Sequence, residues 1–103
     1  MPPIAVHAKL TAQPGKRDEL VTALQELVEA TQSEPGTLVY ALHTSDSDEN
    51  AVWFYELYPD QDARDVHGRS ETMKAIGPKL AGLLGAMPEL SAGTVVGSKG
   101  LPG

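Results

Sequence analysis

The stretch VWFYELYPDQDARDVHGRS, residues 52–70, joins a strand pattern to a helix pattern. It begins as a run of aromatic and branched side chains, which is typical of a β-strand. Pro59 ends that strand, and Asp60 can cap a helix over the residues that follow. The stretch also contains the single Trp and the single Phe of the chain, two of its Tyr and one of its His. It therefore predicts a strand that leads directly into a helix, with most of the aromatic side chains gathered there.

The helix predicted after Asp60 covers QDARDVHGRSETMKAIGPKLAGLLG, residues 61–85. Its inward-facing residues recur at helical spacing. They are Ala63, Val66, His67, Ser70, Met73, Ile76, Leu80, Leu83 and Leu84. Gly68 and the pair Gly77 and Pro78 are expected to kink this helix or to split it in two.

Upstream, IAVHAKL at residues 4–10 alternates in side-chain type and predicts the first strand. A helix is predicted within residues 13–36, on a stripe made of Leu20, Leu24, Leu27, Val28 and Thr31. It should end at SEPG, because Pro35 disfavours helical geometry in Glu34 and Gly36 accepts a positive φ.

Two further strands are predicted, TLVYALHT at residues 37–44 and AVWFYELY at residues 51–58. The polar linker SDSDEN joins them as an antiparallel hairpin. A last strand is expected at GTVVG, residues 93–97.

This order of elements predicts a ferredoxin-like split βαβ arrangement, an α+β fold with both helices on one face of an antiparallel sheet. We expect one domain over residues 1–103, with a core at about 3–97 and a loose C-terminal tail at 98–103. The central strands are apolar on both alternating sets of side chains, whereas a half-exposed sheet should alternate apolar with polar residues. A second copy is therefore expected to cover the open face, which makes a homodimer, a dimeric α+β barrel.

Composition narrows the possible partners. The chain has 8 Lys and Arg against 14 Asp and Glu, and its net charge of -6 argues against nucleic acid and anionic membranes as partners. It has no Cys, and its N-terminal residues lack the features of a signal peptide. A cytoplasmic location is expected. No phosphate-binding loop and no Gly-x-Ser-x-Gly elbow is present.

Two segments carry a resemblance to a known family. They are EPGTLVY at residues 34–40 and FYELYPDQDARDVHGRS at residues 54–70. In the second segment, the pattern of an aromatic, Glu, an aromatic, an acidic helix start, Ala and His falls on Phe54, Glu56, Tyr58, Asp60, Ala63 and His67. On these segments, and over about residues 3–97, the chain resembles the antibiotic biosynthesis monooxygenase family, small dimeric ferredoxin-like proteins that include quinol and anthrone monooxygenases.

The resemblance implies a pocket between sheet and helices in each subunit, and oxygenation of a small aromatic substrate by molecular oxygen without metal, haem or flavin. No cofactor is therefore expected. A related branch that degrades haem should carry an Asn on the first strand and a Trp and a His on the second helix. Here the first strand offers His7 and the second helix has His67 without a Trp, which disfavours that branch.

Such chemistry needs a base, hydrogen bonds to an oxyanion and a dry aromatic cavity. His67 is the candidate base, and Glu56 is the candidate partner that accepts a proton from its ring and orients it. Tyr40 or Tyr58 would hydrogen-bond the oxyanion. The candidate cavity residues are Phe54, Trp53, Leu42, Met73 and Ile76. The sequence leaves open whether Trp53 and Tyr55 line the pocket or the dimer face.

Structural interpretations of the same residues stay open. His67 can be a satisfied core residue, and Glu56 can be a structural partner of His67, or of an Arg such as Arg64 or Arg69, for stability alone. His7 and His43 share one side of the sheet, but two His without a carboxylate make a poor metal site. Two alternative functions remain: a non-catalytic small-ligand-binding module, and a cofactor-free isomerase of a small metabolite.

Overall fold

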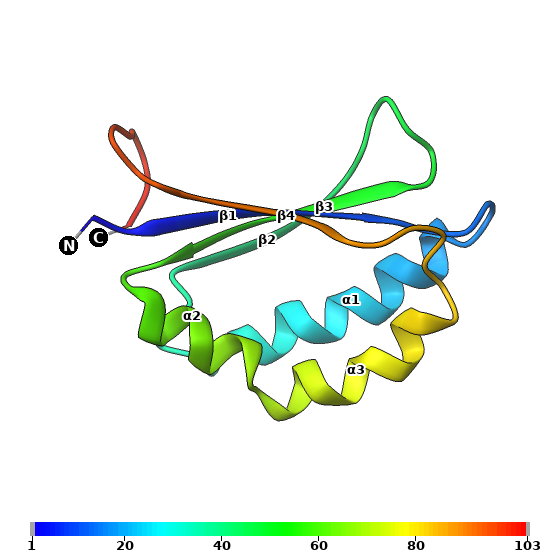
Figure 1. Ribbon diagram of the computed structural model, residues 1–103, viewed down its shortest axis with the longest axis horizontal. Coiled ribbons are helices and arrows are strands. Elements are labelled where there is room, and N and C mark those ends of the chain that lie inside the picture. The colour runs from blue at the N-terminus through cyan, green and yellow to red at the C-terminus, as the bar shows by residue number, and fades with distance from the viewer. Residues whose placement is uncertain (1, 103) are drawn as a thin grey trace.

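The computed structural model describes residues 2–102 (Figure 1). Its elements are β1 (Ile4–Thr11), α1 (Arg17–Thr31), β2 (Val39–Thr44), β3 (Ala51–Tyr58), α2 (Gln61–Gly68), α3 (Glu71–Ala81) and β4 (Glu89–Thr94). The strands form one antiparallel sheet in the order β2-β3-β1-β4, and all three helices lie on one side of it. The predicted ferredoxin-like α+β fold is confirmed.

The register of the sheet shows which side chains of β3 meet the helices. Phe54 pairs with Ala8 of β1 on one side and with Leu42 of β2 on the other, and Phe54 and Ala8 are buried in the core. Successive side chains of a strand point to opposite faces. Glu56 therefore shares the helix face with Phe54, whereas Trp53 and Tyr55 point to the opposite face and do not line a pocket between the sheet and the helices.

Helix α1 buries the stripe that its spacing predicts, including Leu20, Leu24 and Leu27. These leucines pack with Phe54 and with Ile76 of α3 in one apolar core. Asp18 and Glu19 lie in the first turn, where carboxylates favour the partial positive charge of the helix N-terminus.

The helical segment after Asp60 is split, but only at one of the two expected places. Helix α2 ends at Gly68, and Ser70 starts α3 by accepting a hydrogen bond from the Met73 amide at 3.2 Å. Pro78 lies inside α3 without dividing it. The break allows the two helices to take different directions, and Val66, expected to face inward, is instead 59% exposed.

The last strand lies earlier than the sequence predicts. β4 begins at Glu89 and ends at Thr94, so the two Val residues of the GTVVG segment follow it. All of β4 is exposed, and pairing with β1 rather than side-chain packing determines its position. Among residues 2–102, no helix is both long enough and apolar enough to cross a membrane.

Candidate functional site

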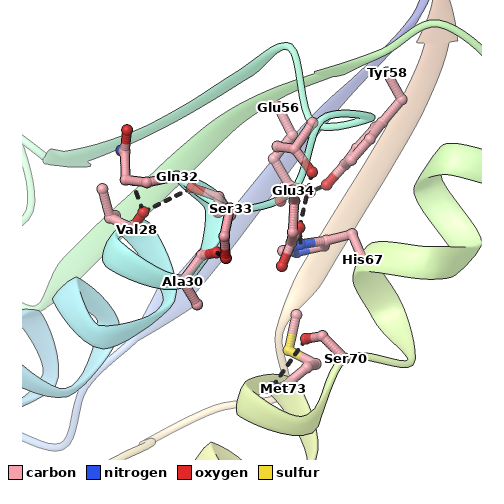
Figure 2. Close-up of polar contacts among 12 residues, drawn as sticks. Val28, Ala30, Gln32, Ser33, Glu34, Glu56, Tyr58, His67, Ser70 and Met73 are labelled. Atoms are coloured by element: carbon pink, nitrogen blue, oxygen red, sulfur yellow. Dashed lines mark hydrogen bonds and ion pairs between the residues drawn. The ribbon is translucent and has the colours of Figure 1, made fainter.

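Polar side chains from three parts of the chain meet under one end of the sheet. Glu34 comes from the turn after α1, Glu56 and Tyr58 come from β3, and His67 comes from the last turn of α2 (Figure 2). His67 and Glu56 are only 4% and 8% exposed. A fourth part of the chain adds Tyr40 of β2, whose ring lies 4.8 Å from the His67 ring. We call these five residues, Glu34, Tyr40, Glu56, Tyr58 and His67, the polar cluster.

Helix α2 brings His67 into this cluster. Asp60 caps the helix by accepting a hydrogen bond from the Ala63 amide at 2.9 Å. His67 lies one turn after Ala63, so both residues lie on the helix face that meets the sheet. The Nδ1 atom of His67 lies 2.8 Å from Oε1 of Glu34. The expectation that Glu56 orients the imidazole is therefore wrong, because Glu34 holds that place.

The turn that carries Glu34 is built from the segment EPGT. The Thr37 amide donates to the Glu34 carbonyl at 3.1 Å, and the Thr37 hydroxyl donates to Glu34 Oε1 at 2.9 Å. A Cβ on Gly36 would lie 2.9 Å from the Cβ of Ala63. Gly36 does not have the positive φ expected of it, which in residues 2–102 occurs only at Gly15 and Gly100. It is needed because α2 packs closely on this turn.

Glu56 is paired with Tyr58 instead. The Tyr58 phenol donates to Glu56 Oε1 at 2.5 Å. Burial raises the pKa of Glu56 above its ordinary value, although the Tyr58 hydrogen bond and the nearby His67 and Arg64 act in the opposite direction. Burial and the bond to Glu56 also raise the pKa of Tyr58. The cluster thus stabilises the neutral acid of Glu56 and the neutral phenol of Tyr58.

Neither predicted Arg partner is the hydrogen-bond partner of Glu56. Arg64 and Arg69 line an open pocket of about 610 Å³ along α2, together with Gln61, Asp65 and Gly68. Arg64 acts on Glu56 only through its charge, which favours the carboxylate.

Tyr40 connects the polar cluster to a groove. Its ring stacks on Phe54, with ring centroids 4.5 Å apart, and lies 4.8 Å from the His67 ring. Burial, with the charges of Glu56 and Glu34, raises the pKa of the Tyr40 phenol. The groove between α1 and β2 has a volume of about 440 Å³. It is lined by Val21, Gln25, Val28, Tyr40, Ala41, Leu42 and Thr44.

The other predicted cavity residues divide between the two faces of the sheet. Phe54 and Ile76 are buried in the core on the helix side, and Leu42 and Met73 pack against them. Trp53, on the open face, does not join them. It lies between two imidazoles, with ring centroids 3.8 Å from His43 and 5.1 Å from His7.

The two His beside Trp53 are therefore placed as the sequence suggested, on one side of the sheet. Within residues 2–102, no group of three or more His, Cys, Asp and Glu side chains is placed to hold a metal ion.

One atom in the polar cluster has no partner. Nε2 of His67 is the only buried side-chain nitrogen or oxygen in residues 2–102 without a hydrogen bond. Buried polar atoms are nearly always paired, and an exception at a cleft or cluster calls for an explanation. An arrangement with Nδ1 anchored and Nε2 unpaired can accept a proton from, or donate one to, a molecule that reaches it.

Sequence reasoning missed Glu34 as a functional residue. It lies 33 positions from His67 in the sequence, in a turn that has no periodic pattern. Its one signal was its place in the EPGTLVY segment that carries the family resemblance.

Comparison with known proteins agrees with this fold. The family model described as antibiotic biosynthesis monooxygenase matches residues 3–79. A Caulobacter crescentus protein described under the same family name is 31% identical, with a TM-score of 0.87 over 93% of this chain and 92% of that one. PA3566 from Pseudomonas aeruginosa is 25% identical, with a TM-score of 0.87 over 94% and 97% of the two chains.

The chain is also similar to an uncharacterised protein from Synechocystis. It is 29% identical over 65 residues, which are 63% of this chain and 44% of that protein, so the match spans less than half of its length. The family model covers β1, β2 and β3, all of α1 and α2 and most of α3, and it includes every residue of the polar cluster. The chain belongs to the antibiotic biosynthesis monooxygenase family.

Proposed function

We propose that this protein is a cofactor-independent monooxygenase that oxidises a small aromatic substrate, such as a quinol or an anthrone, with molecular oxygen. The observation that carries the proposal is the unpaired, buried Nε2 of His67, whose ring is anchored through Nδ1 by Glu34. Family membership supports the reaction type. The Tyr40 ring, which lies 4.8 Å from the His67 ring and stacks on Phe54, supports an aromatic substrate.

The proposed reaction begins with proton removal. His67 Nε2 takes a proton from the hydroxyl or the acidic carbon of the substrate, and the resulting anion transfers one electron to O₂. Recombination of the radical and superoxide, with return of a proton, forms a hydroperoxide. Loss of water then leaves one oxygen atom in the product. For an anthrone, the CH₂ group and O₂ become a carbonyl group and H₂O, so atoms and electrons balance.

The phenol of Tyr40 suits this step. A substrate oxyanion needs hydrogen-bond donors that are not themselves charged negatively. The Tyr40 phenol is available in its protonated form, since burial raises its pKa. Tyr58 is also a neutral phenol, but its proton is already donated to Glu56. We therefore assign oxyanion binding to Tyr40 and a supporting role to the Tyr58 and Glu56 pair.

Access to His67 requires a movement, because the polar cluster is closed and His67 is almost completely buried. Tyr40 forms a wall of the groove between α1 and β2 and also contacts the His67 ring. Rotation of the Tyr40 side chain would join the groove to Nε2. We propose that the substrate enters there, with Val21, Val28 and Leu42 as apolar contacts.

The homodimer belongs to the same proposal. Trp53 with His7 and His43 forms an aromatic row on the sheet face that the helices leave open. Tyr55 and Ala41 pair across β3 and β2 on this same face. A second copy of the chain carries the same aromatic row on its own sheet. A two-fold symmetric contact between the two sheets would therefore bury both rows.

Oxygen uptake by the metal-stripped protein, measured with a panel of quinols and anthrones, tests the function. We expect uptake with the wild type, loss of at least 100-fold in kcat in His67→Gln, and wild-type rates in Glu71→Gln, a control whose side chain is 94% exposed. Binding of the panel without uptake would contradict the proposal and favour a ligand-binding module. Product formation under nitrogen would instead favour an isomerase.

A further inference from the structure

The contact between Glu34 and His67 determines more than the position of the ring. A carboxylate can only accept hydrogen bonds, so the ring nitrogen that faces it must carry a proton. That nitrogen is Nδ1, at 2.8 Å from Oε1. In the neutral imidazole only one nitrogen is protonated, and therefore Nε2 keeps its lone pair.

Two features show that the carboxylate is held as an acceptor. The Thr37 hydroxyl donates to the same oxygen atom, Oε1, at 2.9 Å. The side chain of Glu34 is only 15% exposed, so few water molecules compete with these two donors. Both donors need Oε1 as an acceptor, which is the role that a carboxylate oxygen fills.

The backbone around the pair is also closely fitted. Thr37 closes the turn by its hydrogen bond to the Glu34 carbonyl. Gly36 in this turn packs against Ala63, where a Cβ would be 2.9 Å from that of Ala63. Ala63 and His67 are one turn apart on α2, so this contact sets the distance between Glu34 and the imidazole.

We propose that Glu34 is a positioning residue that holds the proton of His67 on Nδ1 and thereby presents Nε2 as the basic atom. The catalytic consequence rests on the function proposed above. The tautomer does not, because it follows from the Glu34 contact alone.

Long-range proton–nitrogen NMR correlation of the imidazole ring reads the tautomer directly. At mildly alkaline pH, we expect the wild type to show a protonated, pyrrole-type Nδ1 and an unprotonated, pyridine-type Nε2 for His67. The spectra of His7→Gln and His43→Gln assign the remaining ring. A protonated Nε2 with a bare Nδ1 in the wild type would overturn the proposal, whether or not any variant folds.

Two variants then test the cause. In Glu34→Gln the amide can either accept from or donate to Nδ1, so we expect both tautomers and nitrogen shifts that move toward each other. Thr37→Val keeps the carboxylate and should keep the wild-type tautomer. A Glu34→Gln spectrum identical to that of the wild type would show that other contacts hold the proton, and would overturn the assignment.

Kinetics separates this proposal from the proposed function. If oxygen uptake occurs, Glu34→Gln should lower kcat by on the order of 10- to 100-fold with little change in KM. Thr37→Val should have a much smaller effect. If the tautomer is as expected but no oxygen is consumed, the positioning role stands and the monooxygenase proposal fails.

Discussion

The substitution Glu56→Gln tests the electrostatics of the polar cluster. Glu56 is almost fully buried and accepts a hydrogen bond from the Tyr58 phenol. The Gln side chain has nearly the same size and keeps a carbonyl oxygen that accepts this bond. It is uncharged, so its burial does not carry the free-energy cost of removing a charge from water. At neutral pH we therefore expect the free energy of unfolding of Glu56→Gln to equal or exceed that of the wild type.

The size of the effect follows from proton linkage. Burial raises the pKa of Glu56 in the folded state above its ordinary value of 4.5, so the folded protein binds one proton that the unfolded chain has released. As the pH rises between these two pKa values, the wild type loses up to about 1.4 kcal/mol of stability per pH unit relative to Glu56→Gln. Above the raised pKa the difference stays constant.

Urea unfolding at a fixed protein concentration, repeated from about pH 4 to pH 8, measures this difference. Glu71→Gln is the matched control, because the side chain of Glu71 is 94% exposed. Its curve should run parallel to that of the wild type. The reasoning is refuted if the Glu56→Gln curve also runs parallel to the wild type, or if its stability falls relative to the wild type as the pH rises.

Three further outcomes are expected. Gly36→Ala should lower the free energy of unfolding by about 1–3 kcal/mol, since its Cβ would collide with Ala63. A thermal melt checks this, and the double variant Gly36→Ala, Ala63→Gly should recover part of the loss. Tyr58→Phe leaves Glu56 without its buried donor and should cost about 1–3 kcal/mol in urea unfolding; no loss would show that Glu56 is solvated. Trp53→Glu places a charge on the open sheet face, so sedimentation velocity should find the wild type as the proposed dimer and this variant as a monomer; a monomeric wild type or a dimeric variant would contradict an interface on this face.

The first three strands and the first helix could be predicted because their side-chain patterns are strong. AVWFYELY matches β3 residue for residue, and the leucine spacing of α1 defines its buried face. The last strand could not be placed in this way. β4 is an exposed edge strand held by backbone pairing with β1, whereas the prediction followed the β-branched residues that come after it.

The helix division was predicted only in part for a related reason. Pro78 removes one backbone hydrogen bond but lies in the C-terminal part of α3, and Ile76, buried in the core, fixes the helix around it. The break follows Gly68 instead, where Ser70 supplies a new N-cap. Capping chemistry was a better guide here than the presence of Pro.

The sequence predicted several members of the candidate site, but not which of them pair with one another. His67, Glu56 and Tyr58 do meet, because strand alternation and helix spacing fix the faces they occupy. The partner of His67 could not be predicted, since Glu34 lies in a turn whose approach to α2 depends on tertiary packing. Trp53 was ambiguous because both faces of β3 are apolar.

The most direct test of the central claim, that anchored His67 drives oxygenation without a cofactor, is isotope incorporation. The metal-stripped protein is incubated with an anthrone or a quinol under ¹⁸O₂, and the ¹⁸O content of the product is measured by mass spectrometry. We expect one ¹⁸O atom in each product molecule from the wild type, and loss of the labelled product in His67→Gln. Unlabelled product, or labelled product formed equally well by His67→Gln, would contradict it.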